Sequence, residues 1–174
     1  MDYVKGTATL TSKTDIAISL NAGGKESISA KNIIIATGSE VAEIPGTPVK
    51  LDEKVVISST GGLSLPKVPK KMLVVGGGVI VLELGSVYNR LGTEVIAIEY
   101  MDKILPPTDD EVYASLLKIL KAQGIKFMTG YKVISGSVGT GGAKLTIEKS
   151  KRRRKSELEG EVALAATGKR PFTE

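Results

Sequence analysis

The stretch from Met72 to Glu99 constrains the fold most, because it joins two short apolar segments through a glycine triplet and a helical pattern. The first segment is rich in β-branched residues and has the length of a strand buried on both faces. After the glycines, apolar residues recur with the period of a helix, which should begin near Val79 and end at Gly92. The residues that can line one face of this helix are Val79, Leu82, Ser86 and Val87. The second apolar segment ends at Glu99, so the order is strand, glycine turn, helix, strand and carboxylate.

The glycine triplet has the spacing of a phosphate-binding turn. Gly76 permits a tight turn, and Gly78 lets the backbone approach a pyrophosphate because it carries no β carbon. The free N–H groups of the helix that starts near Val79 would then face the phosphates. Glu99 follows at roughly the twenty-residue distance of an acid that accepts hydrogen bonds from ribose hydroxyls. Residues 100–102 offer no arginine for a 2′-phosphate, so the sequence predicts NAD rather than NADP.

Val81 departs from this fingerprint, which expects a third glycine at that position. A glycine there lets the helix pack closely on the strand, so the valine should push the helix out or tilt it. Two interpretations follow. The chain either has a working NAD site, or it is a Rossmann-type half that has lost its ligand.

Composition limits the chemistry that these 174 residues can perform. The sequence has no cysteine for a thiolate or disulfide, and no histidine, the commonest general base and metal ligand, so no metal site is expected. The net charge of +5 depends on the basic run at residues 151–155, which we interpret as a solvated turn; a nuclear-targeting or nucleic-acid role is the alternative. The absence of tryptophan argues against an aromatic nucleic-acid platform, and no apolar run reaches the roughly eighteen residues of a membrane span. We therefore expect no nucleic-acid partner and no membrane partner.

The first part of the chain is expected to be β structure. Residues 2–35 alternate in the manner of antiparallel strands, with a hairpin turn at 21–24. The apolar run at 32–39 should form a buried strand that ends in a small-residue turn, and it needs a larger sheet than the preceding residues supply. From 43 to 69, prolines and glycines mark a boundary region.

The remainder of the chain predicts an α/β fold. Thr108 is the expected N-cap of a helix from Asp109, and a short parallel strand should follow at 125–128. The stripe of this helix expected to be buried is Val112, Leu116, Ile119 and Leu120. Alternating segments between 133 and 147 precede a buried strand at 161–168. Together these segments indicate a Rossmann-like domain, a parallel sheet with helices, that carries an antiparallel β-meander before its last strand.

Five segments, in this order, resemble the flavoprotein disulfide reductases that have two dinucleotide-binding domains. They are IIIATGSEV (33–41), VVISSTGGLSL (55–65), VVGGGVIVLELGSVYNRLGTEV (74–95), LKAQGIKFMTGYKV (120–133) and ATGKRPFTE (166–174). Within the family, residues 58–61 and 83–87 are most similar to the dihydrolipoamide dehydrogenases. The resemblance implies FAD-dependent oxidation of the dihydrolipoamide of 2-oxo acid dehydrogenase complexes, with NAD as acceptor, by a homodimer. It also implies the mitochondrial matrix if the source is eukaryotic and the cytoplasm if it is bacterial.

The same resemblance implies a division of the chain and a set of cofactor contacts. Residues 1–46 would be part of an FAD-binding domain, 47–69 a linker or crossover, and 70–174 the NAD-binding Rossmann-like domain. The implied NAD contacts are Gly76, Gly77, Gly78, Val79, Ile80, Val81, Leu82, Glu83, Glu99, Val133 and Gly168. The implied FAD contacts are Thr37, Gly38, Ser39 and, more weakly, Ala8. The alternative for Thr37 and Gly38 is a plain strand-end turn, and for Val133 it is a strand residue that faces the core.

The family also has parts that these residues do not contain: an FAD-binding glycine fingerprint, a redox-active cysteine pair, and a dimerisation domain with a catalytic histidine and glutamate. We therefore assign no catalytic residue here and expect a central piece of the enzyme that is inactive by itself. One alternative is a non-catalytic NAD-binding module or decayed duplicate, impaired at Val81. Another is a different member of the disulfide-reductase family.

Overall fold

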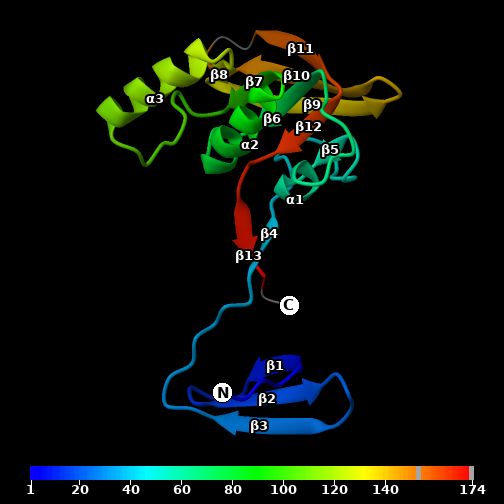
Figure 1. The fold of residues 1–174 in the computed structure, drawn as a ribbon, viewed down its shortest axis with the longest axis vertical. Helices are drawn as coiled ribbons and strands as arrows, with labels where there is room; N and C mark the ends of the chain where they lie inside the picture. The colour runs from blue at the N-terminus through cyan, green and yellow to red at the C-terminus, as the bar shows by residue number, and fades with distance from the viewer. Residues whose placement is uncertain (152–153, 173–174) are drawn as a thin grey trace. The chain divides into compact units, whose positions relative to one another are not determined.

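The computed structural model describes residues 1–151 and 154–172 and contains two compact units, Met1–Gly38 and Ser39–Glu174 (Figure 1). The first unit is a three-stranded antiparallel sheet in the order β1-β2-β3. Its strands are β1 (Gly6–Leu10), β2 (Asp15–Leu20) and β3 (Lys25–Ser29). The hairpin between β2 and β3 turns at Gly23 and Gly24, whose positive φ angles of 91° and 94° suit glycine. The expected antiparallel strands are therefore confirmed.

The segment after β3 differs from the buried strand that the sequence predicts at 32–39. Residues 33–38 belong to no strand, and the side chains of Ile34 and Ile35 are 91% and 68% exposed. A strand needs a neighbour that pairs with its backbone N–H and C=O groups, and apolar composition alone does not supply one. The buried strand predicted from the isoleucines is therefore wrong, and Ser39, which was expected in the turn at its end, instead begins β4 (Ser39–Val41).

The second unit is built on a five-stranded parallel sheet in the order β5-β12-β6-β7-β8. These strands are β5 (Val56–Ile57), β6 (Lys71–Val75), β7 (Glu94–Glu99), β8 (Lys126–Thr129) and β12 (Val162–Ala165). The helices are α1 (Ser59–Gly62), α2 (Val79–Arg90) and α3 (Asp110–Ala122). The strand, glycine turn, helix and strand expected at 72–99 are therefore present, and the predicted α/β fold is confirmed.

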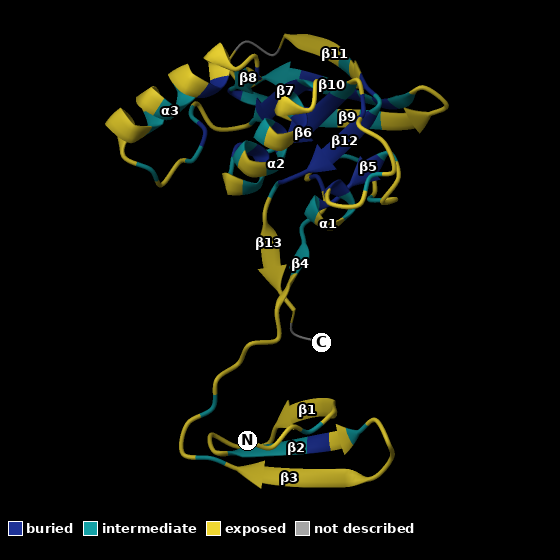
Figure 2. Cartoon of the chain, in the orientation of Figure 1, coloured by how far each residue is buried: buried dark blue, intermediate teal, exposed yellow. Residues whose placement is uncertain are grey.

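A second, antiparallel sheet in the order β11-β10-β9 packs against the parallel one. Its strands are β9 (Tyr131–Gly139), β10 (Gly142–Lys149) and β11 (Lys155–Gly160). Successive residues of a strand face opposite sides, so Met72 and Val74 join the core shared with the helices. Leu73 and Val75 join the core shared with β9 and β10. The parallel sheet is consequently buried on both faces, as its dark colour in Figure 2 shows.

Helix α2 buries a different face from the one expected. Its buried residues are Val81, Gly85 and Tyr88, whereas Val79 and Val87 are exposed. Because apolar residues surround most of this helix, periodicity alone cannot choose the face. Gly85 lies on the buried face, where a β carbon would make ordinary van der Waals contact with Val95 at 3.5 Å.

Helix α3 also differs in its cap and in its buried stripe. The N-cap is Asp109 rather than Thr108, because its carboxylate accepts hydrogen bonds from the N–H groups two and three residues further on. Val112 and Ile119 are exposed. The residues of α3 that pack on the core are Tyr113, Leu116, Leu117 and Leu120.

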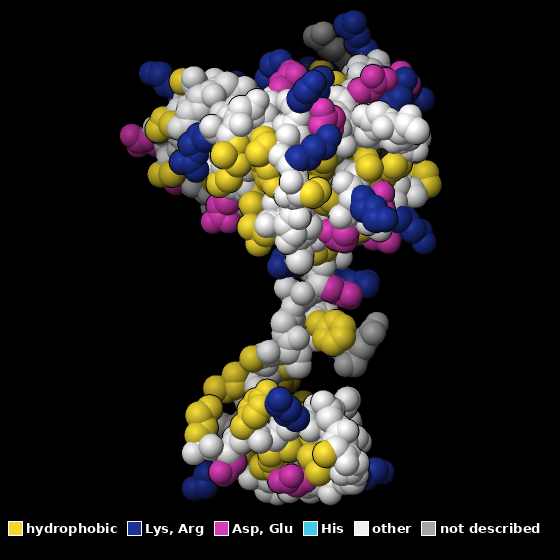
Figure 3. Space-filling model, turned by 45° about the vertical axis from the view of Figure 1, so that its right-hand side comes forward, with side chains coloured by type: hydrophobic (Ala, Val, Ile, Leu, Met, Phe, Trp, Pro, Cys, Tyr) yellow, Lys and Arg dark blue, Asp and Glu magenta, His cyan; other side chains and the backbone are white. Residues whose placement is uncertain are grey.

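Charged side chains of both signs are interspersed over the second unit on the face seen in Figure 3. In the basic run, the Nζ of Lys151 lies 3.0 Å from the Oδ2 of Asp102, and Lys155 begins β11. Arg152 and Arg153, the centre of that run, lie outside the described residues. At least one end of the run is therefore engaged in an ion pair.

Candidate functional site

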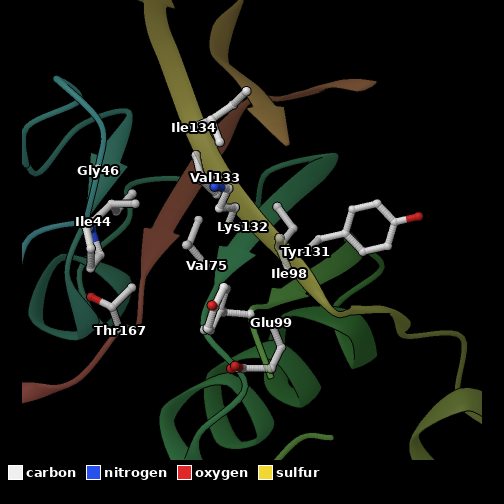
Figure 4. A pocket seen from close by; sticks show the side chains of 13 residues that line it. Ile44, Gly46, Val75, Ile98, Glu99, Tyr131, Lys132, Val133, Ile134 and Thr167 are labelled. Carbon is white, nitrogen blue, oxygen red and sulfur yellow. The ribbon is translucent and has the colours of Figure 1, made fainter. Parts of the chain in front are cut away.

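The carboxyl ends of three neighbouring parallel strands meet at one edge of the sheet. Strand β6 ends at Val75 and leads into the glycine triplet, β7 ends at Glu99, and Thr167 follows β12. A pocket of about 600 Å³ opens at this edge. Figure 4 shows Glu99 and Thr167 on either side of the strand end that carries Val75, with β9 crossing beside them. Ligands of open α/β sheets bind outside the carboxyl ends of the strands, which is where this pocket lies.

Gly76 makes the turn that leaves β6. Its φ is +120°, and a β carbon there would lie 2.2 Å from the carbonyl oxygen of Ala166. Its N–H donates to the carbonyl oxygen of Ile98 at 2.8 Å, which ties the turn to the end of β7. Both the backbone angle and the close approach to the loop after β12 therefore require glycine at this position.

The start of α2 suits a negatively charged group. The N-cap is Gly78, and among the described residues no side chain caps the first N–H groups of the helix. The first turn contains no acidic residue, and a β carbon at Gly78 would have no heavy atom within 4 Å. The first turn thus presents unfilled hydrogen-bond donors and the positive end of the helix dipole beside open space.

Glu99 is held at the edge of the pocket by backbone on two sides. Its Oε1 accepts a hydrogen bond from the N–H of Met101 at 2.6 Å. Its Oε2 lies over Gly77, where a β carbon would be only 2.6 Å away. The carboxylate, the glycine turn and the pocket are therefore brought together by the structure.

Val133 and Gly168 lie near the same strand ends in different ways. Val133 lines the pocket, but it is only 7% exposed and belongs to the hydrophobic core. Its position is therefore compatible with a cofactor contact and with a strand residue that faces the core. Gly168 has a φ of +129° and follows Thr167, which lines the pocket. The Oγ1 of Thr167 donates to the carbonyl oxygens of residues 42 and 43, each at 3.2 Å. These contacts fix the turn after β12 against the segment that forms another wall.

The five other α2 residues named from the sequence divide between solvent and core. Val79 and Glu83 are exposed, whereas Ile80 and Leu82 are half-buried and pack at the margin of the core. Val81 is 1% exposed and lies inside the core shared by the helices and the sheet. The valine that departs from the fingerprint is thus accommodated in the core rather than in the pocket.

The residues implied to contact FAD lie in or at the ends of β structure. Ala8 is in β1, opposite Ile18, and Ser39 begins β4, opposite Pro171. Thr37 and Gly38 follow the exposed isoleucines, and Gly38 has a φ of +84°. Their role toward a flavin stays a prediction.

Sequence reasoning did not identify several walls of the pocket. Ile44 and Gly46 come from the region assigned only to a boundary, and Tyr131 and Lys132 come from the start of β9. The Nζ of Lys132 lies 3.4 Å from the Oε1 of Glu148 on the neighbouring strand. A turn signal at Gly130, whose φ is +73°, marks the start of β9, but nothing local indicates that this strand crosses the ends of the parallel sheet.

Comparisons with known proteins agree with this fold. A profile of the pyridine nucleotide-disulphide oxidoreductase family matches residues 1–174, and the chain therefore belongs to this family. Dihydrolipoamide dehydrogenase of Chaetomium thermophilum is 48% identical over 174 residues, covering 99% of this chain and 34% of that relative. Dihydrolipoyl dehydrogenase 3 of Pseudomonas putida is 42% identical over 173 residues, covering 99% of this chain and 37% of the relative. These relatives confirm the resemblance to dihydrolipoamide dehydrogenases.

The chain is also similar to a reductase with a different name and to a solved structure. Leghemoglobin reductase of Glycine max is 40% identical over 171 residues, covering 98% of this chain and 32% of its own length. The structure of LpdA from Mycobacterium tuberculosis superposes with a TM-score of 0.76 at 22% identity, covering 97% of this chain and 36% of that one. At this identity the match shows a shared fold. The chain spans about a third of the length of the curated relatives it matches.

The relatives include mitochondrial proteins of eukaryotes and bacterial proteins. Within the described residues, no helix is long and apolar enough to cross a membrane. In the same part of the chain, no cluster of acidic residues has the grouping of a metal site.

Proposed function

We propose that this chain supplies the NAD site, and part of the FAD contacts, of a dihydrolipoamide dehydrogenase. One observation carries the proposal: the carboxylate of Glu99 is held beside a glycine turn at the mouth of a pocket where three parallel strands end. This combination meets the two needs of a dinucleotide, a backbone cradle for the pyrophosphate and an acceptor for the ribose hydroxyls.

The residues present fit such a ligand. A β carbon at Gly76 would overlap the backbone of Ala166, and no side chain in the described part of the chain caps the α2 N-terminus. The backbone of residues 76–79 would hold the pyrophosphate, and Glu99 would accept hydrogen bonds from the adenosine ribose. Glu83, exposed on α2, is the residue expected near the nicotinamide, and Val133 is expected to contact the cofactor from β9. When bound, NAD supplies a hydride acceptor.

In the proposed parent enzyme, dihydrolipoamide of a 2-oxo acid dehydrogenase complex is oxidised and its two electrons pass through a disulfide and FAD to NAD. Thr37, Gly38, Ser39 and Ala8 are proposed to contact FAD. The chain has no cysteine and no histidine, so the thiol chemistry and its general base must be supplied by other residues. We propose that the isolated chain binds NAD without oxidising dihydrolipoamide. The parent enzyme would be a homodimer, in the mitochondrial matrix of a eukaryote or the cytoplasm of a bacterium.

The test is a fluorescence titration of the purified chain with NADH, with NADPH in parallel under identical conditions. We expect saturable NADH binding and at least about tenfold weaker NADPH binding, because Glu99 repels a 2′-phosphate. The matched variant Glu99→Gln keeps the shape of the side chain and removes its charge, so it should narrow this difference. A folded chain that binds neither nucleotide would contradict the proposal.

The competing function is a decayed module whose site is impaired at Val81. The same titration of Val81→Gly decides between them. If the site works as it stands, NADH affinity should change less than about threefold, since Val81 lies in the core. A large gain in NADH affinity would instead favour the decayed module. Stability should fall in either case, because the change empties a buried position and places glycine within a helix.

A further inference from the structure

The loop between β7 and α3, residues 100–109, contains a leucine in an unfavourable backbone conformation. Leu105 has a φ of +47°, in the left-handed region that a residue with a β carbon seldom adopts. Such a conformation persists only where the surrounding structure fixes it. Contacts on both sides of Leu105 must therefore hold it in place.

Both backbone polar groups of Leu105 are hydrogen-bonded. Its N–H donates to the carbonyl oxygen of Gly77 at 2.8 Å, and its own carbonyl oxygen accepts a hydrogen bond from the N–H of Thr108 at 2.8 Å. The preceding residue, Ile104, is completely buried in the core shared with the helices. The Nζ of Lys103 donates to the carbonyl oxygen of Thr108 at 3.2 Å. The loop is thus anchored from within, and the N–H of Leu105 ties the glycine turn to it.

The hydrogen bond from Leu105 fixes the orientation of the peptide unit between Gly77 and Gly78. This peptide is trans, and in a planar trans peptide the C=O and N–H groups point in opposite directions. Because the carbonyl of Gly77 faces the loop, the N–H of Gly78 points away from it. Within the described residues this N–H has no hydrogen-bond acceptor, and it adjoins the first turn of α2. The loop therefore orients one unfilled donor of the turn.

We propose that Leu105 is a positioning residue for the pyrophosphate of the dinucleotide: its N–H holds the carbonyl of Gly77 so that the N–H of Gly78 is aimed at a phosphate oxygen. This inference rests on the proposed NAD site. Leu105 acts through the peptide unit and not by contact with the ligand. A donor that is oriented in advance loses less freedom when the ligand binds, so the strained conformation of Leu105 contributes to affinity.

The experiment replaces the N–H of Leu105 by an ester oxygen, through incorporation of the α-hydroxy acid analogue of leucine. The matched control places an ester at Thr108, whose N–H makes a hydrogen bond of the same length in the same loop. The ester at Leu105 should weaken NADH and NADPH binding by at least about fivefold each, because both nucleotides carry the pyrophosphate. The ester at Thr108 should change both affinities less than about twofold. Leu105→Asn, which keeps the N–H and tolerates a left-handed backbone, should also stay within about twofold.

An NMR measurement on the unmodified chain keeps the inference testable if the ester at Leu105 prevents folding. NADH should shift the amide proton of Gly78 downfield and slow the hydrogen exchange of the Leu105 N–H, because the two hydrogen bonds share one peptide unit and strengthen each other. NADH binding that leaves both amides unchanged would overturn the inference. So would an ester at Leu105 that weakens NADH binding less than about twofold, or no more than the ester at Thr108. A folded unmodified chain that binds no NADH would instead overturn the proposed function, and the inference with it.

Discussion

Two apolar segments of this chain end in the same three residues, Ala-Thr-Gly, and have different structures. Residues 33–38 read IIIATG, and residues 163–168 read ALAATG. The second segment forms most of β12, with Leu164 completely buried between β5 and β6. The first belongs to no strand and exposes Ile34 and Ile35. Both end in a glycine of positive φ, at +84° for Gly38 and +129° for Gly168.

The two segments show that the turn depends on local sequence alone, whereas the strand depends on neighbouring strands. The turn is local, because glycine adopts this backbone conformation wherever it stands. The strand depends on partners: the N–H of Ala163 donates to the carbonyl oxygen of Val55, and that of Ala166 donates to Val75, each at 2.8 Å. In the described residues no strand flanks 33–38 in this way. The segment with the more apolar sequence, 33–38, is therefore not the one that forms a strand.

The largest expected effect comes from truncating one side chain in each segment. Leu164→Ala should lower the free energy of unfolding of the second unit by about 2–5 kcal/mol, because it leaves a cavity in a packed core. Ile34→Ala, at a side chain that is 91% exposed, should change stability by less than about 0.5 kcal/mol. Urea denaturation followed by circular dichroism measures both. Similar losses of stability in the two variants would show that both segments are packed to the same extent, contrary to the structure.

A smaller effect tests the turns alone. Gly76→Ala and Gly168→Ala both place a side chain at a positive φ, which costs about 1–2 kcal/mol. At Gly168 the β carbon meets no atom within 4 Å, whereas at Gly76 it overlaps the carbonyl oxygen of Ala166. Gly76→Ala should therefore be the more destabilising by about 1–3 kcal/mol in thermal or urea unfolding. Equal costs would mean that backbone conformation, and not the neighbouring loop, dictates both glycines.

The smallest effect concerns one carboxylate in each unit. In the first unit, hydrogen bonds from the hydroxyls of Ser12 and Ser29 lower the pKa of Asp15. In the second, partial burial works to raise the pKa of Asp52, but backbone N–H groups, including those of residues 54–56, outweigh it and leave that pKa lowered. Because each folded pKa lies below the ordinary aspartate value of 3.8, the stabilisation is present above that pH and is lost as the pH falls through the folded value.

The measurement is an NMR titration of the carboxyl groups, combined with acid unfolding of Asp15→Asn and Asp52→Asn. In each variant, the free energy of unfolding should depend less steeply on pH below about pH 4. This change should be confined to the unit that contains the substituted residue. A change in the other unit would show that the two units do not respond independently to acid.

Much of the second unit could be predicted because its signals are local. The strand before Gly76, the helix after Gly78 and the acid at Glu99 are all marked by residues that decide their own conformation or termini. The contacts of Gly77 could not be predicted in this way. They depend on a hydrogen bond from Leu105, and no sequence pattern marks a leucine of positive φ.

The errors in the helices and strands have the same origin. Apolar residues on several sides of α2 and α3 leave the buried face to be chosen by packing, so Val79 and Val112 are exposed against expectation. Thr108 and Asp109 are both good N-caps, and only the backbone geometry decides between them. The isoleucines at 33–35 predict a strand correctly only where a sheet is available to receive it.

The pairing of β4 with β13 (Lys169–Pro171) has a consequence for engineering. Ser39 lies opposite Pro171 in this antiparallel ribbon, and an ion pair of 2.6 Å joins Glu40 Oε1 to Arg170 Nε. Figure 1 shows the two strands, cyan and red, side by side. The chain thus enters and leaves the parallel-sheet unit at adjoining points, as a domain inserted into a host loop must. We therefore expect that residues 39–171 can be inserted into a surface loop of another protein, because the two junctions would lie side by side.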